Sequence, residues 1–392
     1  MTSDILSRAR EIQDQLVTWR REIHQHPELG FQEHRTAKLV TDVLHELGLN
    51  PQTGIGKTGV VGRLGSGKPA LGIRADMDAL EIQEANQVPY ASRVPGVMHA
   101  CGHDAHTAML LGTARILSQY PDRPPGEIRF LFQPMEEGWD EEGKGGARRM
   151  IEDGALEGLD AVFALHVDST IPTGKIAVES GPIMAGVDPY DAVITGVSSH
   201  SASPHQGVNP IGLLAQVINA IQAIPPLYTD PLQPALISCE AVHGGSSSGV
   251  IPGEVSLHGN IRYYDQETRR EIHQALKSAL ESVRAWGGDF QLNIQGVFPP
   301  TLNDPRLTDL VRTSLNEVVG QDSVLPLKRS LAGEDFGYMS EKVPGVYFHL
   351  GAGIEGDFRP YHNPHFDLDE SALPLGSAAL AAVALNYLHN QG

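Results

Sequence analysis

The stretch ALGIRADMD, residues 70–78, decides the fold, because it is an apolar run that ends on two aspartates. A short apolar run without alternation is typical of a strand that is buried on both faces, as in the sheet of an α/β protein. Ligands of such sheets bind outside the carboxyl ends of the strands. Asp76 and Asp78 therefore mark one edge at which we expect a functional site.

The segments around this stretch extend the α/β pattern. Residues 59–64 form a second apolar run, and the turn sequence at 65–69 predicts that the two runs pair as a hairpin. Strands and helices then alternate, as they do in α/β proteins. The strands are expected at 128–132, 161–165 and 346–350, and the helices at 107–119, 147–153 and 372–388.

A different order of elements occupies residues 187–297, where the pattern is strand, helix, strand, strand, helix, strand. This is the split β-α-β-β-α-β (ferredoxin-like) sandwich, a compact unit in its own right. We therefore expect an α/β catalytic domain with a central mixed sheet, made of residues 1–186 and 298–392 and interrupted by an inserted domain at 187–297. The length of 392 residues also favours two domains.

The composition limits the partners and the compartment. The formal net charge is −19, which repels phosphate backbones and anionic membranes, so neither a nucleic acid nor a membrane is expected as a partner. Cys101 and Cys239 are the only cysteines, which indicates a reducing compartment without disulfides. The first residues lead directly into an amphipathic pattern and not into an apolar leader, so we expect a cytoplasmic protein.

Residues of the metal-ligand types gather where the apolar runs stop. The amino end of a helix favours a thiolate, and cysteine combined with histidine suits zinc or a similar divalent ion. A single residue of this kind is more often a cap, a turn former or a small buried side chain. Five of them at successive strand ends are hard to explain in that way. The expected ligands are Cys101, His103, Glu137, His166 and His362.

The adjacent carboxylates of Glu136 and Glu137 are expected to have different roles. If Glu137 binds metal, Glu136 can accept a proton from water whose pKa a divalent ion lowers from about 15.7 to about 7. The acidic residues 140–142 fit a solvated loop. The residue types alone do not decide whether Asp76 or Asp78 supports the ligands.

Five motifs together resemble the aminoacylase/carboxypeptidase superfamily of dinuclear metallohydrolases. They are RADMDAL at 74–80, HACGHD at 99–104, QPMEE at 133–137, GEDF at 333–336 and HNPHFD at 362–367. The sequence Cys-Gly-His-Asp within the second motif resembles the one found in a particular branch of this superfamily. That branch contains hippurate hydrolases, N-acyl-amino-acid amidohydrolases and auxin-conjugate (IAA-amino acid) hydrolases. The resemblance extends from Arg20 to the C-terminus.

This resemblance implies a reaction, the hydrolysis of the amide bond of an N-acyl amino acid by metal-activated water. The five ligands would hold two divalent ions per subunit, with zinc as the first choice and manganese, cobalt or nickel as alternatives. Glu136 would be the general base, and Asp78 would support a ligand.

The resemblance also gives the inserted domain a role as a dimerisation lid of a homodimer. This lid would contribute His200 to the active site of the partner subunit. Arg262, Gly249 and Gly351 would lie at the substrate. Gly249 stands where relatives usually carry Asn, so Arg262 would hold the carboxylate of the substrate without help from that amide.

Two alternatives stay open. A dipeptidase or carboxypeptidase needs the same two-metal centre and differs only in the pocket for the acyl side. A catalytically idle relative would bind an amino-acid derivative without turnover, although a loss of ligands or base would then be expected. The acyl group, the amino acid and the ligand that bridges the ions are not decided by the sequence.

Overall fold

The computed structural model describes residues 2–230 and 232–391, which form two compact units. Unit 1 contains the chain up to Ile183, Leu302–Lys328 and the chain from Asp335 onward. Unit 2 contains Met184–Thr301 and Arg329–Glu334. The expected fold class is confirmed, since unit 1 has a mixed central sheet and unit 2 a separate antiparallel sheet.

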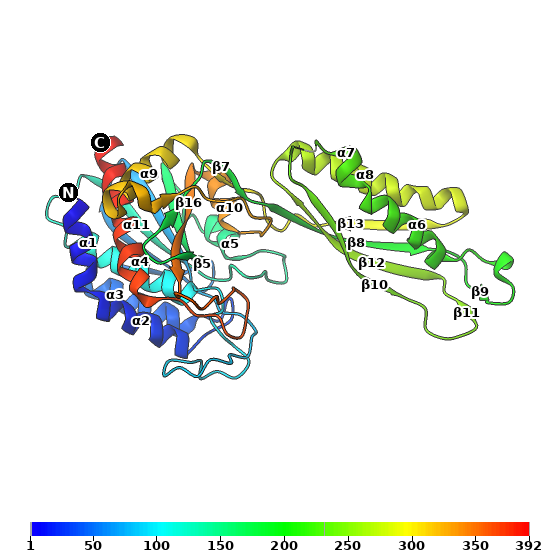
Figure 1. The fold of residues 1–392 in the computed structure, drawn as a ribbon, viewed down its shortest axis with the longest axis horizontal. Helices are drawn as coiled ribbons and strands as arrows, with labels where there is room; N and C mark the ends of the chain where they lie inside the picture. Colours follow the sequence, from blue (N-terminus) through cyan, green and yellow to red (C-terminus); the bar gives the residue numbers. More distant parts are fainter. Residues whose placement is uncertain (1, 231, 392) are drawn as a thin grey trace. The chain divides into compact units, whose positions relative to one another are not determined.

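The sheet of unit 1 has eight strands among the described residues, and its central strands are parallel (Figure 1). In spatial order they are β1 (Gln52–Ile55), β2 (Gly59–Ser66), β4 (Gly126–Gln133), β3 (Ala70–Asp76), β5 (Ala161–Pro172), β16 (Gly345–Gly353), β6 (Ile176–Ala177) and β15 (Val324–Leu325). Strands β4, β3, β5 and β16 run parallel to one another, so their carboxyl ends meet at one edge.

The predicted hairpin of residues 59–74 is wrong. Strand β4 lies between β2 and β3, pairing antiparallel with β2 and parallel with β3. Every residue of β3 is buried, which is typical of a central strand with a neighbour on each side. The turn between the two strands is therefore a crossover within the sheet.

Helices cover both faces of this sheet (Figure 1). One group of helices packs together on one face, and a pair of short helices covers the other. The first group is α1 (Thr2–Glu11), α2 (Gln13–Gln25), α3 (His34–Glu46), α4 (His103–Ser118), α9 (Pro305–Val319) and α11 (Leu373–Gln391), and the pair is α5 (Gly146–Glu152) and α10 (Phe336–Lys342). Helix α11 is long and apolar enough to cross a membrane, but most of it is buried in unit 1, as expected of a core helix.

Unit 2 is a four-stranded antiparallel sheet with helices packed on one face. Its buried residues alternate along β12, so that one face of the sheet is covered and the other is more open. The elements in chain order are β8 (Gly186–Thr195), β9 (Ser199–His200), α6 (Pro210–Gln222), α7 (Ile224–Tyr228), β10 (Leu236–Gly244), β11 (Val250–Ile251), β12 (Glu254–Tyr263), α8 (Gln266–Glu281) and β13 (Asp289–Ile294). The sheet order is β10-β12-β8-β13.

A buried carboxyl group connects the start of α3 to the segment after β4. Glu33 is fully buried and accepts hydrogen bonds from the backbone N–H of Met135, at 2.9 Å, and from the hydroxyl of Thr58. The φ angle of Met135 is 43°, in the left-handed region that residues with side chains rarely adopt. Burial, and then the nearby charge of Asp78, raises the pKa of Glu33 from 4.5 to about 7.

The raised pKa of Glu33 predicts that Glu33→Gln gains stability relative to the wild type as the pH rises. The folded state keeps a proton that the unfolded state releases above pH 4.5, so the contribution of Glu33 is full below that pH and is lost as the pH rises through 7. The difference amounts to roughly 3 kcal/mol. It can be measured as the free energy of unfolding of the metal-free protein at pH 5 and pH 8. Glu46→Gln, at an exposed position of the same helix, is the control. An equal effect of Glu33→Gln at both pH values would contradict the prediction.

Candidate metal centre

The five expected ligands lie together in unit 1. The ligand atoms of Cys101, His103 and His166 are all within 4.8 Å of one another, and so are those of Cys101, Glu137 and His362. Cys101 belongs to both groups. Residues from four separate segments therefore form one cluster that could hold two ions.

Local structure explains how the first ligands are presented. Helix α4 begins at His103, and Gly102 separates it from Cys101. The φ of Gly102 is 91°, and a Cβ atom at this position would lie 2.4 Å from Cγ2 of Val167. Only glycine fits both the backbone conformation and the space.

The other ligands come from the ends of parallel strands. Glu137 follows β4, and His362 lies in the loop after β16. His166 lies within β5, beyond the last residue, Ala164, that pairs with β3. Glu137 and His362 therefore follow their strands, as the sequence indicated. The expected end of a strand at Leu165 is wrong, because β5 continues to Pro172 and still pairs with β16 at His166.

Hydrogen bonds direct one nitrogen of two histidines toward the cluster. Nδ1 of His103 donates to the carbonyl oxygen of Asp78 at 2.9 Å, and Nδ1 of His166 donates to that of Val167 at 2.6 Å. In each ring Nε2 is then the nitrogen that can carry the lone pair. Nε2 of His103 is buried and has no hydrogen-bond partner among the described residues. Such an atom fits a metal ligand, because leaving it unpaired in the interior is costly.

The charge of the metal-free cluster also fits a cation site. Burial lowers the pKa of His103, but the carboxylates of Asp76, Asp78 and Glu137 outweigh it and raise that pKa to about 10. Burial and the carboxylates of Glu137 and Glu136 raise the pKa of the Cys101 thiol well above its ordinary value. Without metal, protons on His103 and Cys101 therefore offset the negative charge of the carboxylates, as divalent ions would do when bound.

Asp78 makes shorter contacts with the ligands than Asp76 does. Its Oδ2 accepts a hydrogen bond from the backbone N–H of Glu137 at 2.9 Å, and its Oδ1 lies 3.3 Å from Nδ1 of His103. Asp76 contacts His106 at 2.6 Å and Arg74 at 2.7 Å, and its Oδ2 lies farther away, 3.8 Å, from Nε2 of His103. The geometry thus favours Asp78 for the supporting role that residue types alone left undecided.

Glu136 lies beside the cluster. It is buried, and its Oε2 is 3.9 Å from Nε2 of His103. Its carboxylate therefore lies beside the ligand atoms, where it could exchange a proton with water bound to a metal ion.

Three of the expected site residues, His200, Gly249 and Arg262, belong to unit 2. His200, in β9, pairs with Val250 of β11. Its Nδ1 accepts a hydrogen bond from the backbone N–H of Ala202 at 3.0 Å, so the ring proton is on Nε2. His200 is thus able to donate a hydrogen bond from its exposed side chain.

Gly249 immediately precedes β11 and therefore lies close to His200. Its φ is 85°, and its carbonyl oxygen accepts a hydrogen bond from the backbone N–H of Ser201 at 2.9 Å. Arg262 lies in β12, where its Nη1 donates to the carbonyl oxygen of Leu331 at 2.5 Å. Unit 2 therefore holds His200 and Gly249 at the small two-stranded sheet of β9 and β11, and Arg262 on the four-stranded sheet.

Gly351 lies in β16 of unit 1, and the position has a structural need for glycine. Its backbone N–H donates to the carbonyl oxygen of Lys175 at 2.9 Å. A Cβ atom would lie 2.2 Å from the carbonyl oxygen of Pro172. The close approach of two backbones therefore excludes a side chain here.

The sequence did not identify the role of His106. Its Nε2 accepts a hydrogen bond from the backbone N–H of Val167 at 2.9 Å, and its Nδ1 donates to Asp76 at 2.6 Å. This contact fixes the strand segment that carries His166. The available signal was the spacing of His103 and His106, since residues three apart lie on the same face of a helix.

Known proteins resemble this chain over nearly its whole length. The family described as "Peptidase family M20/M25/M40" matches residues 72–386 of this chain. Thermostable carboxypeptidase 2 of Saccharolobus solfataricus is 39% identical over 385 residues, which are 96% of this chain and 96% of that protein. N-acyl-L-amino acid amidohydrolase of Geobacillus stearothermophilus is 41% identical over 314 residues, 78% of this chain and 84% of that one.

A solved structure adds the metal content of a relative. The YXEP protein of Bacillus subtilis, described as a dinuclear metal binding peptidase from the M20 family, has a TM-score of 0.85 and 33% identity, and covers 97% of this chain and 99% of its own. The family match extends over most of the chain and includes every ligand proposed above. The chain therefore belongs to peptidase family M20/M25/M40, a family of dinuclear metal-binding hydrolases.

Proposed function

We propose that this protein hydrolyses the amide bond between an acyl group and an amino acid. The observation that carries the proposal is the position of Glu136, a buried carboxylate 3.9 Å from the ligand nitrogen of His103 and outside the five ligands themselves. The relative from Geobacillus stearothermophilus, named for the same reaction, supports the substrate class.

The residues divide the work of the reaction between them. Two divalent ions, zinc in the first place, would polarise the scissile carbonyl and acidify the attacking water. Cys101, His103, Glu137, His166 and His362 would hold them. Glu136 takes the proton from the attacking water and delivers it to the nitrogen of the leaving amino acid. Asp78 keeps His103 and Glu137 in place through the contacts described above.

Unit 2 would bind the substrate and the developing negative charge. His200, with its proton on Nε2, would donate a hydrogen bond to the carbonyl oxygen as that oxygen becomes an oxyanion. Arg262 would hold the carboxylate of the amino-acid part without the amide that Gly249 replaces, and Gly351 would lie near the substrate. We place His200 in the active site of a partner subunit, within a homodimer formed through unit 2.

A carboxypeptidase or dipeptidase activity is the second candidate. The relative named thermostable carboxypeptidase 2 favours it, because its identity extends over 96% of this chain. The same metal centre serves both reactions, so the acyl-side pocket decides between them. A catalytically idle protein is the least favoured, because all five ligands and Glu136 are present.

The two free cysteines support a reducing compartment, for which we propose the cytoplasm.

Replacing Glu136 by Gln is expected to abolish turnover while metal stays bound. The amide has the same shape but cannot accept the proton, so kcat on an N-acyl amino acid should fall by about 10²–10⁴-fold. Glu141→Gln, in the exposed loop after the motif, is the matched control and should keep normal kcat. Metal content should be equal in the three proteins by elemental analysis. A Glu136→Gln enzyme with near-normal kcat would rule out this mechanism.

A substrate panel separates the two candidate functions. N-acetyl and N-benzoyl amino acids and dipeptides with the same leaving amino acid would be compared by kcat/KM. The proposal expects the N-acyl amino acids to be the better substrates by about tenfold or more, which corresponds to about 1.4 kcal/mol of transition-state binding. Higher values for the dipeptides would favour the peptidase alternative.

Metal removal tests the requirement for two ions. Treatment with a strong chelator should abolish hydrolysis, and activity should return only after about two equivalents of a divalent ion are added back. Zinc, manganese, cobalt and nickel would be compared in separate titrations. Full activity with one equivalent would contradict a two-ion reaction.

A further inference from the structure

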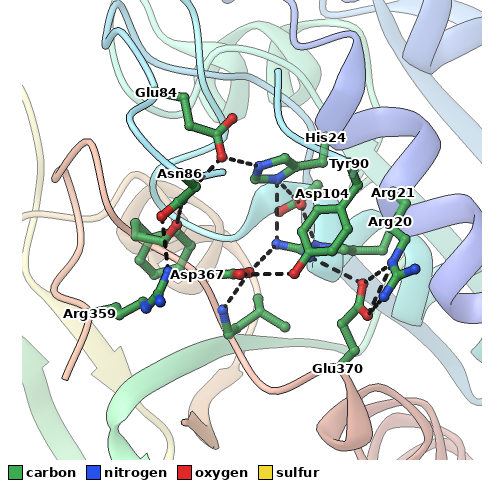
Figure 2. A network of polar contacts seen from close by, with 12 residues as sticks. Arg20, Arg21, His24, Glu84, Asn86, Tyr90, Asp104, Arg359, Asp367 and Glu370 are labelled. Carbon is green, nitrogen blue, oxygen red and sulfur yellow. Dashed lines mark hydrogen bonds and ion pairs between the residues drawn. The ribbon is translucent and has the colours of Figure 1, made fainter. Parts of the chain in front are cut away.

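Figure 2 shows a cluster of charged residues, one of which, Asp104, directly follows the proposed ligand His103 in the chain. The side chain of Arg20, in α2, has no exposed surface. Its guanidinium donates to Asp104 at 2.8 Å, to Asp367 at 3.0 Å and to Glu370 at 3.2 Å. We call these residues, together with His24, the Arg20 cluster. One cation therefore contacts three carboxylates, which come from two separate segments of the chain.

Aromatic and polar side chains complete the surroundings of Arg20. Cζ of Arg20 lies 4.8 Å from the centre of the Tyr90 ring, and the hydroxyl of Tyr90 donates to Asp367 at 2.9 Å. Nδ1 of His24 lies 2.7 Å from the same oxygen of Asp104 that Arg20 contacts. The guanidinium is thus fixed in position on several sides.

The carboxylates of the cluster follow the proposed metal ligands in the chain. Asp104 comes directly after His103, in the first turn of α4. Asp367 lies in the loop that carries His362, between β16 and the short helix η4 (Glu370–Ala372). Arg20 therefore connects the segment of Cys101 and His103 to the loop of His362.

His362 depends on such contacts for its position. Its φ is 53°, in the left-handed region, and its side chain is 54% exposed. A residue holds this conformation only when surrounding contacts fix it. One of these contacts is the hydrogen bond from the His362 backbone N–H to the carbonyl oxygen of Ala100 at 2.8 Å. The Arg20 cluster joins the same two segments again through side chains.

We infer that Arg20 is a positioning residue for the proposed ion site formed by Cys101, Glu137 and His362. It holds the loop of His362 against the start of α4, so that the three ligand atoms stay within 4.8 Å of one another before metal binds. The inference rests on the proposed metal centre. Residues behind the ligands of a metal site commonly contribute about 10–100-fold in metal affinity.

Arg20→Lys tests the inference, with Arg21→Lys as the matched control. Lysine keeps the positive charge but cannot reach three carboxylates with the planar donor geometry of arginine. Arg21, on the same helix, donates two hydrogen bonds to Glu370. Among the described residues it does not bond to Asp104 or Asp367, so its change removes similar chemistry beside the cluster. Zn²⁺ alone would be titrated into each metal-free protein in competition with a chelating dye.

The expected result is a selective loss in one of two affinities. The wild type and Arg21→Lys should bind two Zn²⁺ with similar dissociation constants. In Arg20→Lys the dissociation constant of the more weakly bound Zn²⁺ should rise by about tenfold or more. Thermal unfolding of the metal-free proteins shows whether stability has changed separately from zinc affinity.

Other outcomes separate this inference from the proposed function. Binding of fewer than two Zn²⁺ by the wild type would contradict the proposed two-ion metal centre itself. Two Zn²⁺ bound by Arg20→Lys as tightly as by Arg21→Lys, even with a lower unfolding temperature, would overturn the positioning role alone. If Arg20→Lys does not fold, Asp367→Asn takes its place, because it keeps the shape of the side chain. Weaker binding of the second Zn²⁺ by that variant supports the role, and unchanged binding overturns it.

Discussion

Asp78 holds two proposed ligands that come from different parts of the chain, one through its side chain and one through its backbone carbonyl. The carbonyl orients the ring of His103 at the start of α4, and the side chain accepts the backbone N–H of Glu137 after β4. Because Asp78 lies two residues beyond the end of β3, its own position is set by the central strand of the sheet. The arrangement of the site therefore depends on the parallel pairing of β3 with β4 and β5.

Further buried polar groups support the ligands from behind. Asp76 and His106 connect the end of β3 to β5, Glu33 fixes the backbone just before Glu136, and Arg20 connects the start of α4 to the loop of His362. Each of these groups is buried, so each would be costly without its partners. A site made largely from loops is in this way held by residues of the regular elements.

The sequence was sufficient for the parts of the fold and site that follow from local patterns. Apolar runs that stop on ligand-type residues predicted the edge where Glu137, His166 and His362 meet, because parallel strands share their carboxyl edge. The hairpin at residues 59–74 was wrong, because a turn signal does not reveal that β4, some fifty residues later, will lie between the two strands. Arg20 could not be recognised either. Its partners lie 84, 347 and 350 residues away, and no local pattern marks a buried guanidinium of this kind.

The extension of β5 past its pairing with β3, along β16, has a consequence for how this site tolerates sequence change. Beyond Ala164 the strand no longer pairs with β3, and the peptide groups of Val167 instead bind the rings of His106 and His166 and the hydroxyl of Tyr361. These contacts use main-chain atoms, so exchanging the side chain at this position leaves the donor and acceptor in place. Inserting or deleting one residue earlier in β5 would present a different peptide group and turn the following side chains to the opposite face. The orientation of His166 is therefore encoded in the length of a strand more than in the identity of its neighbours.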